Sequence, residues 1–306
     1  MIMIQKYVKR PSLLLLKLIR NLWFLFPDDI YLKIVYRLEM GKSLNLKNPQ
    51  LYQEKLQWLK LYNKKTHYTS MVDKIIAKEV AAKIIGKQYI IPTLGVWDSF
   101  DDINFDSLPN QFVLKTNNGG GNVGVVICKD KTLFDKRKAR KILNRSLKFN
   151  IYNIYREWPY KNIKPQILAE EFMSDDTEFN KTGLVDYKFT CFNGVADNVM
   201  LCLDRNTNDP KFYFYDIDWN LLRLNKRGKD APKDFYLPKP DCLAEMFKLA
   251  GRLSEGIPFL RVDLFYVNGK IYFGEMTFFP ASGFDSNILP ETEIYFGNKI
   301  NLNINN

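Results

Sequence analysis

The 306-residue chain has little of the two side chains that most often hold transition metals or serve nucleophilic catalysis. Histidine occurs once, at His67, which excludes paired-histidine zinc sites and leaves a Ser–His–Asp triad a single possible base. No Gly-x-Ser-x-Gly sequence accompanies it. The four cysteines form no Cys-x-x-Cys pair, and their apolar neighbours indicate buried free thiols, which suit a reducing, cytoplasmic compartment. Chemistry in this chain must come from carboxylates, lysines, arginines and backbone amides.

The chain also lacks an uninterrupted apolar run long enough to cross a membrane. Residues 13–26 are rich in leucine, but Lys17 and Arg20 interrupt them and Pro27 ends them, whereas a spanning helix needs about 20 mostly apolar residues. The Phe-Pro-Asp-Asp sequence at 26–29 does not resemble a signal-peptide cleavage site. What remains is a basic, apolar helix. Two interpretations stay open: a helix packed on the protein, or one lying in the plane of an anionic membrane at the inner face of the cell.

Acidic residues are outnumbered by basic ones, 34 to 45, which gives a formal charge of +11. Residues 1–60 hold eleven of the basic and four of the acidic residues. Because the excess belongs mainly to this segment, a nucleic-acid-binding surface is not predicted. The length suits one large domain or two modest ones, with enough chain to bury a core.

Turn signals predict hairpins rather than an alternating βαβ pattern. The dipeptides Asn193-Gly194 and Asn268-Gly269 are typical of type I′ turns, and a third hairpin is expected where two apolar strands flank a glycine-rich loop at 116–124. A helix is expected to run from Ser70 to Gly86, because Ser70 and Asp73 have the spacing of a capping box. Hairpins with intervening helices predict an α+β fold with two antiparallel layers.

The glycine-rich loop is the strongest local signal. Lys115 ends a predicted strand, and four glycines follow within the next nine residues. Glycines let backbone amides approach phosphate oxygens, and a lysine supplies a compact positive charge. The Gly-Lys-Ser/Thr ending of a Walker A loop is missing, and a strand rather than a helix follows, which also excludes a Rossmann fingerprint. We therefore interpret the segment as a phosphate-binding hairpin; a plain glycine-rich turn is the alternative.

A second signal lies in the hairpin centred on Asn268-Gly269. Ideal pairing across this turn places Asp263 and Glu275 within one residue of each other, and closer if a bulge intervenes. Two neighbouring carboxylates with substrate phosphates form the environment that Mg²⁺ prefers. Arg261 lies on the same side of its strand as Asp263. The alternative is a pair of solvated edge charges, which the flanking apolar residues disfavour.

Two acidic segments are weak signals alone. Glu170 and Glu171 end a predicted strand, and Asp186 stands two residues before Lys188. Acidic residues at a strand end are most often a solvated edge. These two segments become informative when they are considered together with the other motifs, in their order along the chain.

Taken in order, these pieces resemble the ATP-grasp superfamily and, more narrowly, the TupA-like (teichuronopeptide-biosynthesis) ATP-grasp family. The resemblance covers about residues 45–300, and the set of motifs is specific although no single one is. It is carried by these segments: Asn48-Pro49 with Glu54-Lys55-Leu-Gln-Trp58, Phe112–Lys115, Ala169–Glu171, Asp186–Gly194, Arg261–Leu264 and Phe273–Pro280. Proteins of this family accompany bacterial capsule, O-antigen and teichuronic-polymer genes, where some are labelled glycosyltransferases.

The resemblance implies an ATP site, an Mg²⁺ site and two groups that act on the phosphoryl group. Carried over by motif, the nucleotide-binding residues would be Lys74 and Lys115 on the phosphates, Gly119, Gly120 and Gly121 closing over them, Glu170 and Glu171 at the adenine-binding hinge, and Asp186 on the ribose. The metal ligands would be Asp263, Glu275 and Thr277. Lys188 would point toward the phosphates, and Arg261 would neutralise the transferred phosphoryl group.

Two departures from the family pattern limit this transfer. Many ATP-grasp enzymes end the metal motif in Asn, where this chain has Thr277, a poorer ligand that puts a second Mg²⁺ in doubt. Residues 1–60 are also too short and too helical for the α/β domain that precedes many grasp ligases, so the acceptor site cannot be carried over. The expected division is a helical extension at 1–62, a small glycine-loop subdomain at 63–172 and a large metal-binding subdomain at 173–306.

The leading hypothesis is a ligase that joins a carboxylate to an amine through an acyl phosphate. The family suggests a uronic acid of a surface polysaccharide and an amino acid as substrates. A kinase of the same fold acting on a sugar hydroxyl is the first alternative. A membrane or polyanion-binding module with an inactive nucleotide site is another, against which the joint presence of Lys115, Arg261, Asp263 and Glu275 argues. A glycosyltransferase would want an Asp-x-Asp strand end, and the candidate, Asp216-Ile-Asp218, is expected in a loop.

Overall fold

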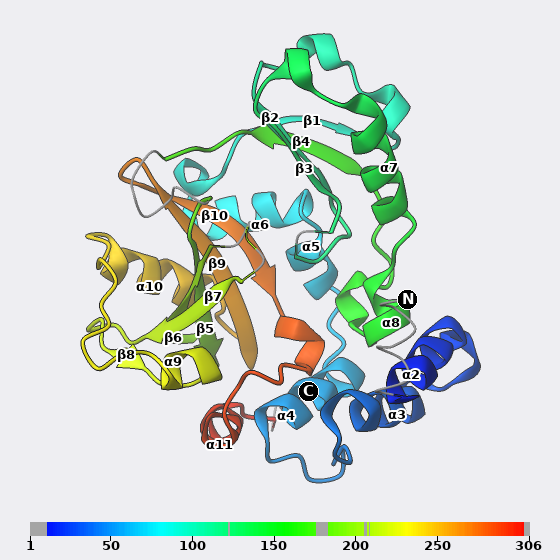
Figure 1. Cartoon of the computed structure of the whole chain (residues 1–306), viewed down its shortest axis with the longest axis vertical. Helices are drawn as coiled ribbons and strands as arrows, with labels where there is room; N and C mark the ends of the chain where they lie inside the picture. The colour runs from blue at the N-terminus through cyan, green and yellow to red at the C-terminus, as the bar shows by residue number, and fades with distance from the viewer. Residues whose placement is uncertain (1–10, 122, 176–182, 205–206, 208, 303–306) are drawn as a thin grey trace.

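The computed structural model describes residues 11–302 apart from 122, 176–182, 205–206 and 208. Two antiparallel sheets form its framework (Figure 1). The smaller has four strands in the order β1-β4-β2-β3, and the larger has six in the order β10-β9-β5-β6-β7-β8. The predicted α+β architecture with two antiparallel layers is confirmed.

The small sheet is built from β1 (Thr93–Trp97), β2 (Phe112–Thr116), β3 (Val125–Cys128) and β4 (Ile167–Glu171). Helix α7 (Lys136–Leu147) covers one face. Phe112 and Leu114 alternate along β2 and are fully buried in a core that also contains Leu143 of α7. Because neighbouring side chains on a strand point to opposite faces, Lys115 lies on the face away from this core.

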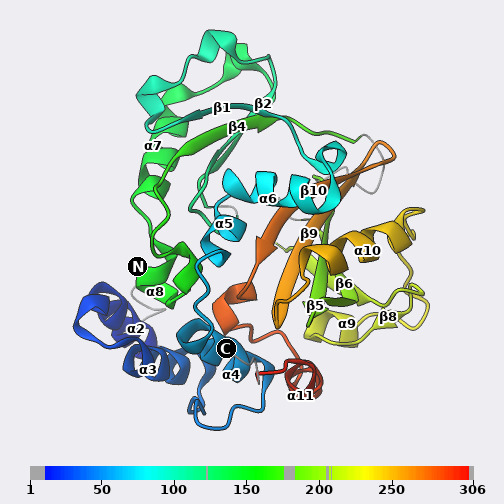
Figure 2. The same cartoon turned by 180° about the vertical axis from the view of Figure 1, so that it is seen from behind.

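The large sheet is built from β5 (Asp186–Phe192), β6 (Val195–Leu203), β7 (Lys211–Tyr215), β8 (Leu221–Leu222), β9 (Phe259–Val267) and β10 (Lys270–Thr277). Helices α6 (Ile76–Ile85) and α10 (Leu243–Leu253) pack against it (Figure 2). Both helices contribute to the largest hydrophobic core, together with Phe189, Val262 and Leu264.

Both predicted Asn-Gly turns form as expected. Asn193 and Gly194 have φ of 52° and 86°, and Asn268 and Gly269 have φ of 49° and 77°. Positive φ at both central residues is the geometry of a type I′ turn, which matches the right-handed twist of the flanking strands. The turns therefore fix the pairing of β5 with β6 and of β9 with β10.

The N-terminal helices form a separate small core. Helices α2 (Pro11–Asn21) and α3 (Asp28–Met40), with the 3₁₀ turn η1 (Trp23–Leu25), bury Leu16, Tyr31 and Val35 together. Helix α4 (Tyr52–Tyr62) instead packs on α11 (Pro290–Lys299) beside the large sheet. Of the described helices, none is long and apolar enough to span a bilayer.

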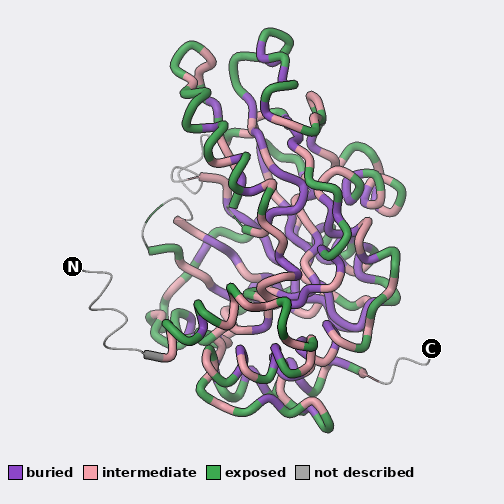
Figure 3. The backbone as a smooth tube through the Cα atoms, turned by 90° about the vertical axis from the view of Figure 1, so that its right-hand side faces the viewer, coloured by how far each residue is buried: buried purple, intermediate pink, exposed green. Residues whose placement is uncertain are grey.

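Shorter elements connect these units. They are α5 (Tyr68–Val72), α8 (Ile151–Tyr155) and α9 (Lys226–Lys229), with 3₁₀ turns η2 (Lys87–Tyr89), η3 (Phe100–Asp102), η4 (Phe105–Ser107), η5 (Lys131–Leu133), η6 (Trp158–Tyr160) and η8 (Pro280–Gly283). Buried residues gather toward the middle of the molecule, and exposed residues lie mostly at its outer edges (Figure 3). The four cysteines all lie in described segments and form no disulfide, and Cys128, Cys191 and Cys202 are buried.

The three hydrophobic cores do not follow the predicted domain boundaries in every detail. Helices α4 and α6, expected in the extension and the small subdomain, both pack into the core of the large sheet. The small-sheet core draws on residues between Phe100 and Ala169. The three-part division stays a prediction.

Candidate functional site

The helix expected over 70–86 is interrupted, and the interruption places a lysine in the site. Helix α5 ends at Val72 and α6 begins at Ile76. The predicted capping box at Ser70 is therefore wrong: the Asp73 carboxylate instead accepts from the backbone N–H of Ile75, at 2.9 Å, and so caps the start of α6. Lys74, at the break, donates to the carbonyl of Gly119.

Asn117 ties the glycine loop to this break. Its side chain is fully buried and donates to Asp73 Oδ2 and to the carbonyl of Lys164, each at 3.0 Å. Its carbonyl accepts from the N–H of Lys74 at 3.3 Å. Gly124 has a φ of 72° and its Cα lies against the paired hydroxyls of Thr116 and Ser146, so a side chain there would collide with both. The loop is thus anchored at its two ends.

A buried carboxylate on β4 pairs with two lysines, and we call Lys78, Lys115 and Glu170 the small-sheet cluster. Lys78 of α6 lies 3.0 Å from Glu170 Oε1, and Lys115 of β2 donates to Oε2. Lys78 also donates to Thr93 Oγ1 at 2.7 Å. Burial by itself would raise the pKa of the Glu170 carboxyl, but Lys115 and Lys78 outweigh it and hold that pKa below its usual value. Burial lowers the pKa of Lys78, and Glu170 offsets part of this effect.

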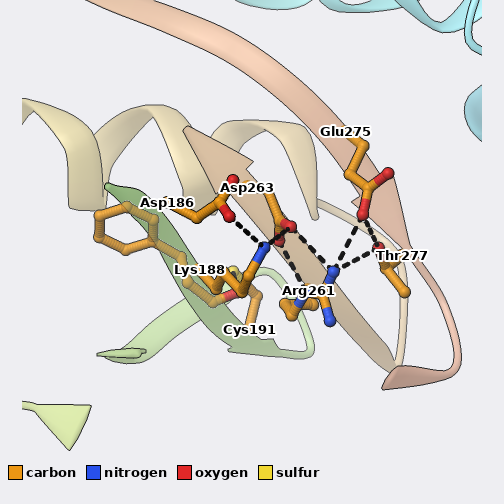
Figure 4. Close-up of polar contacts among 8 residues, drawn as sticks. Asp186, Lys188, Cys191, Arg261, Asp263, Glu275 and Thr277 are labelled. Atoms are coloured by element: carbon orange, nitrogen blue, oxygen red, sulfur yellow. Dashed lines mark hydrogen bonds and ion pairs between the residues drawn. The ribbon is translucent and has the colours of Figure 1, made fainter. Parts of the chain in front are cut away.

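The second group of charges lies on the large sheet (Figure 4). A bulge between Phe273 and Glu275 brings Glu275 directly opposite Asp263, although ideal pairing would leave them one residue out of register. Lys188 of β5 is paired with Asp263 on its other side. We call the residues that these three strands bring together the large-sheet cluster: Asp186, Lys188, Arg261, Asp263, Glu275 and Thr277.

Arg261 joins the two carboxylates of the β9–β10 hairpin. Its guanidinium donates to both Asp263 oxygens, at 2.6 and 2.8 Å, and to Glu275 Oε1 at 3.0 Å. It also donates to Thr277 Oγ1 at 3.1 Å. Lys188 Nζ lies 2.5 Å from Asp263 Oδ2 and 3.5 Å from Asp186 Oδ2. The arrangement places two basic side chains among three carboxylates.

Burial shapes the charges of this cluster. Burial opposes ionisation of Asp263, but Arg261 and Lys188 outweigh it and hold the pKa of that carboxyl below its ordinary value. Burial likewise opposes the charge on Arg261, and Asp263 and Glu275 outweigh it, which raises the pKa of the guanidinium. Both groups stay charged at neutral pH.

Lys74 connects the two clusters. Burial lowers the pKa of its amino group, and its charge interacts with Glu275 of the large-sheet cluster and with Lys115 and Glu170 of the small-sheet cluster. Figures 1 and 2 place α5 and α6, which flank Lys74, between the two sheets. Helix α6, which carries Lys78, contacts β10, which carries Glu275, so the two clusters lie beside the same helix.

The donor set fits ATP with Mg²⁺. Asp263 and Glu275 converge on one point, which the Arg261 guanidinium spans here, so that point already stabilises a positive charge between them. Among the described residues, no group of three or more His, Cys, Asp or Glu side chains is arranged to hold a metal. Two carboxylates with the Thr277 hydroxyl would therefore be completed by nucleotide phosphate oxygens or water, as is common for Mg²⁺.

The predicted residues do not all come together. Glu171, expected at the adenine hinge with Glu170, is exposed at the end of β4, and its backbone N–H donates to the carbonyl of Pro92. Gly121 is exposed, while Gly119 is buried beside Lys74. Outside the site, Asp216 accepts from the backbone and side chain of Asn220 in its own turn, so the Asp-x-Asp segment is a turn structure.

Sequence reasoning missed two residues of the site. Lys78 stands four residues after Lys74, a helical spacing that could have marked it as a second lysine near the same surface. Asn117 is placed by three contacts with segments far along the chain, and its sequence neighbours gave no sign of this role.

Comparison with known families agrees with this geometry. The model of the TupA-like ATP-grasp family matches residues 54–301. The chain belongs to this family. The family expected from the motifs is confirmed, and with it the ATP-grasp class of the fold. Curated protein sequences give no significant match.

The solved structures that resemble the chain include three ligases, all at low similarity. D-alanine–D-alanine ligase from Bacillus anthracis is 17% identical with a TM-score of 0.42, over 75% of this chain and 66% of the ligase. The Helicobacter pylori enzyme is 15% identical with a TM-score of 0.43, over 82% and 69%. The D-cycloserine synthetase DcsG is 14% identical with a TM-score of 0.41, over 76% and 69%. The chain thus spans slightly less than two thirds of the Bacillus anthracis ligase.

Proposed function

We propose that this protein is an ATP- and Mg²⁺-dependent carboxylate–amine ligase. The observation that carries the proposal is the position of Lys74, which lies at the break between α5 and α6 and donates to the carbonyl of Gly119 in the glycine loop. A lysine-rich surface on one sheet and a carboxylate-rich surface on the other suit a nucleotide bound between them with its phosphates near Lys74 and Lys115. Membership of the ATP-grasp family supports the same assignment.

Phosphoryl transfer asks the protein mainly for positioning and charge neutralisation. A substrate carboxylate oxygen attacks the γ-phosphorus, the bond to the ADP oxygen breaks, and an acyl phosphate forms. Lys74, Lys115 and the amides of the loop 119–121 would hold the phosphates, and Arg261 would follow the phosphoryl group from ATP to product. Mg²⁺, held by Asp263 and Glu275, would supply charge neutralisation. The lack of histidine is no obstacle to this chemistry.

Further roles follow from the family motifs. Glu170 and Glu171 would lie near the adenine, Asp186 near the ribose and Lys188 near the phosphates. The contacts described above support Lys188 most directly, because it lies beside Asp263. We propose that the carboxylate is a uronic acid of a capsule or O-antigen precursor and that the amine is an amino acid, since proteins of this family accompany such polysaccharide genes.

Hydroxylamine trapping tests the reaction. With ATP, Mg²⁺ and a uronic acid but no amine, a ligase should give a hydroxamate, and ADP release should depend on the carboxylate. A kinase would release ADP with a sugar alcohol that has no carboxylate and would give no hydroxamate. That result would replace the ligase proposal while leaving the ATP site intact.

We further propose that the N-terminal helices contact the anionic inner surface of the cell membrane. Leu16 is buried against α3, but Leu14, Leu18 and Phe24 are 60%, 53% and 63% exposed. Lys17 is exposed among them, and residues 1–10, outside the described structure, contribute Lys6, Lys9 and Arg10 to the sequence and no acidic residue. Exposed apolar side chains bordered by lysines suit a helix in the plane of an anionic interface.

Liposome sedimentation tests this contact. The protein should sediment with anionic but not with neutral vesicles, and salt should weaken binding. The triple change Leu14→Ser, Leu18→Ser, Phe24→Ser should abolish it. Leu133→Ser is the matched control, because Leu133 is 82% exposed on the small subdomain. If wild-type protein ignores anionic vesicles, the helices serve only their own small core.

A further inference from the structure

The loop that follows the metal-binding strand has a strained shape that other elements hold in place. In η8, Ala281 and Ser282 have φ of 46° and 53°, in the left-handed region that residues with a side chain seldom adopt. Gln57 of α4 donates to the carbonyl of Gly283 at 2.8 Å, and Lys60 donates to that of Ser282 at 2.8 Å. Strain of this kind persists where the surroundings over-determine it, most often at functional sites.

Glu157 also bonds to this loop. It lies in the segment between α8 and β4, is 5% exposed, and accepts from the Ser282 hydroxyl at 2.5 Å. Its charge interacts with Lys60 and with Arg261 and Glu275 of the large-sheet cluster. Tyr160, buried three residues further, interacts with Glu157, Glu275 and Arg261. The turn η6, which begins one residue after Glu157, contacts α5, and α5 contacts β10, the strand that carries Glu275. Ser282 follows the end of β10 by five residues. The Glu157–Ser282 pair therefore lies close in the fold to the strand on which the proposed acyl phosphate would form.

The amide-forming step needs a group that removes a proton. An amine substrate arrives as an ammonium ion at neutral pH, and only the uncharged amine is a nucleophile. The other carboxylates of the two clusters are already engaged: Asp263 by Arg261 and Lys188, Asp186 by Lys188, Glu170 by two lysines, and Glu275 by Arg261 and Thr277. Glu157 accepts from a neutral hydroxyl, and Lys60, whose charge interacts with it, donates instead to Gln57 Oε1 and to the carbonyl of Ser282. The Glu157 carboxylate therefore keeps acceptor capacity for a cationic substrate.

We propose that Glu157 and Ser282 form the amine subsite. In it, Glu157 binds the substrate ammonium and accepts its proton, while the Ser282 hydroxyl orients the Glu157 carboxylate. This inference rests on the proposed ligase function and assigns residues to its second step, in which the amide forms. The free amine then attacks the acyl carbon, the C–N bond forms and the bond to the phosphate oxygen breaks. The remaining excess proton on nitrogen leaves with the phosphate, and Glu157 returns its proton to water.

Burial raises the pKa of the Glu157 carboxyl, whereas Lys60 and Arg261 lower it. A carboxyl with a raised pKa is a stronger proton acceptor than an ordinary one, which suits a general base. Lys60 is fully buried under the loop, and burial lowers the pKa of its amino group to about 7. Its position beneath η8 makes it a part of the loop's support.

Two nucleophiles separate this role from a structural one. Hydroxylamine is largely uncharged at neutral pH and needs no base, whereas amino acids arrive protonated. We compare hydroxamate formation with amide formation from a mixture of the twenty common amino acids, each with ATP, Mg²⁺ and a uronic acid, with products identified by mass. Glu157→Gln keeps the shape of the side chain, and its amide oxygen can still accept from the Ser282 hydroxyl. Hydroxamate formation by this variant should therefore stay within about twofold of the wild-type rate.

Amide formation by Glu157→Gln should fall about a hundredfold or more, the range of general-base contributions. Ser282→Ala should lower it less and also spare hydroxamate formation. Equal loss of both products in Glu157→Gln, or undiminished amide formation, would overturn the subsite. Failure of the wild-type protein to form any hydroxamate would instead overturn the ligase proposal, so the two failures are distinguishable. Glu157→Asp, which keeps the base, should recover part of the amide-forming activity.

Discussion

The two charge clusters that face the proposed nucleotide site are built alike and balanced differently. Each has at its centre a buried carboxylate, Glu170 or Asp263, whose two oxygens are bound by two basic side chains. The small-sheet cluster has no further acid and carries a net positive charge. The large-sheet cluster adds Asp186 and Glu275 and carries a net negative charge.

This difference suits a site that binds both an anion and a cation, as the proposed function requires. The excess positive charge on the small sheet suits phosphates, and the excess negative charge on the large sheet suits a divalent cation. The central carboxylate has the same task on both sides: it keeps two buried basic groups charged and in place. Removing a central carboxylate should therefore damage folding, whereas removing a peripheral charge should damage ligand binding.

The change Asp263→Asn should have the largest effect. It removes a metal ligand and leaves Lys188 and Arg261 buried without their main counter-ion, a loss that typically costs about 3–5 kcal/mol. We expect loss of turnover together with a lower free energy of unfolding in urea. Glu275→Gln, at a partly exposed position, should abolish turnover equally but leave the midpoint nearly unchanged. Equal destabilisation by both changes would contradict the distinction between central and peripheral charges.

Acid provides a second test of the same carboxylate. The pKa of Asp263 is lower in the folded protein than in the unfolded chain. At pH values between these two pKa values, the unfolded chain therefore binds more protons than the folded protein. The stabilising contribution of Asp263 is complete above the ordinary value of about 3.9 and is lost as pH falls through the folded value. The difference in unfolding free energy between wild type and Asp263→Asn should therefore shrink below about pH 4. A difference that stays constant with pH would show that the carboxylate's charge is not what stabilises the fold.

On the small sheet, Lys115→Ala should weaken nucleotide binding with little cost in stability. Lys115 is partly exposed, and its partner Glu170 keeps Lys78. We expect ATP affinity, measured by calorimetry, to fall at least tenfold while the thermal midpoint shifts by no more than a few degrees. Lys78→Met is the matched change at a buried lysine, and it should lower the midpoint more. Unchanged ATP affinity in folded Lys115→Ala would remove the phosphate role of the glycine loop.

The parts of this site that were predictable from the sequence are those whose residues lie close together along the chain. The Asn-Gly turn fixed the neighbourhood of Asp263 and Glu275, because register in a short hairpin is a local property. The helix break at Asp73 was not predictable in the same way. It depends on Asn117, a residue 44 positions away, which bonds the Asp73 carboxylate. Helical propensity contains no information about that contact, so a continuous helix was the natural expectation.

The same reasoning applies to Glu170. Its sequence position at a strand end is typical of a solvated acid, yet it is buried between lysines from α6 and β2. The strand order β1-β4-β2 places β4 inside the sheet and brings Lys115 of β2 to it, and the packing of α6 supplies Lys78. The neighbourhood of residues that face each other within one hairpin was predictable from spacing. Contacts that depend on sheet order or helix packing were not, as the position of Lys78 shows.

Arg261→Lys should have a smaller effect than the loss of either carboxylate. The ammonium keeps the charge but cannot bind both Asp263 oxygens and Glu275 at once, as the planar guanidinium does. We expect a loss of about tenfold to a hundredfold in the rate of carboxylate-dependent ADP formation, with ATP affinity little changed. Arg261→Met, which removes the charge, should be clearly worse. If the lysine variant matches the methionine variant, geometry rather than charge is the contribution of this residue.

The smallest effect is expected at Thr277, which tests the rim of the large-sheet cluster. Its hydroxyl accepts from Arg261 at 3.1 Å and lies 3.3 Å from Glu275 Oε1, so it supports two groups that also bind each other. Thr277→Val preserves the shape and removes the hydroxyl, and the rate should fall only a fewfold with a modest rise in the Mg²⁺ concentration needed for half-maximal activity. Thr277→Asn supplies an amide oxygen, a better metal ligand, and should lower that concentration. No change in Mg²⁺ dependence in either variant would mean that the hydroxyl does not belong to the metal site. A large loss of rate in the valine variant would instead contradict the peripheral role of Thr277 in this cluster.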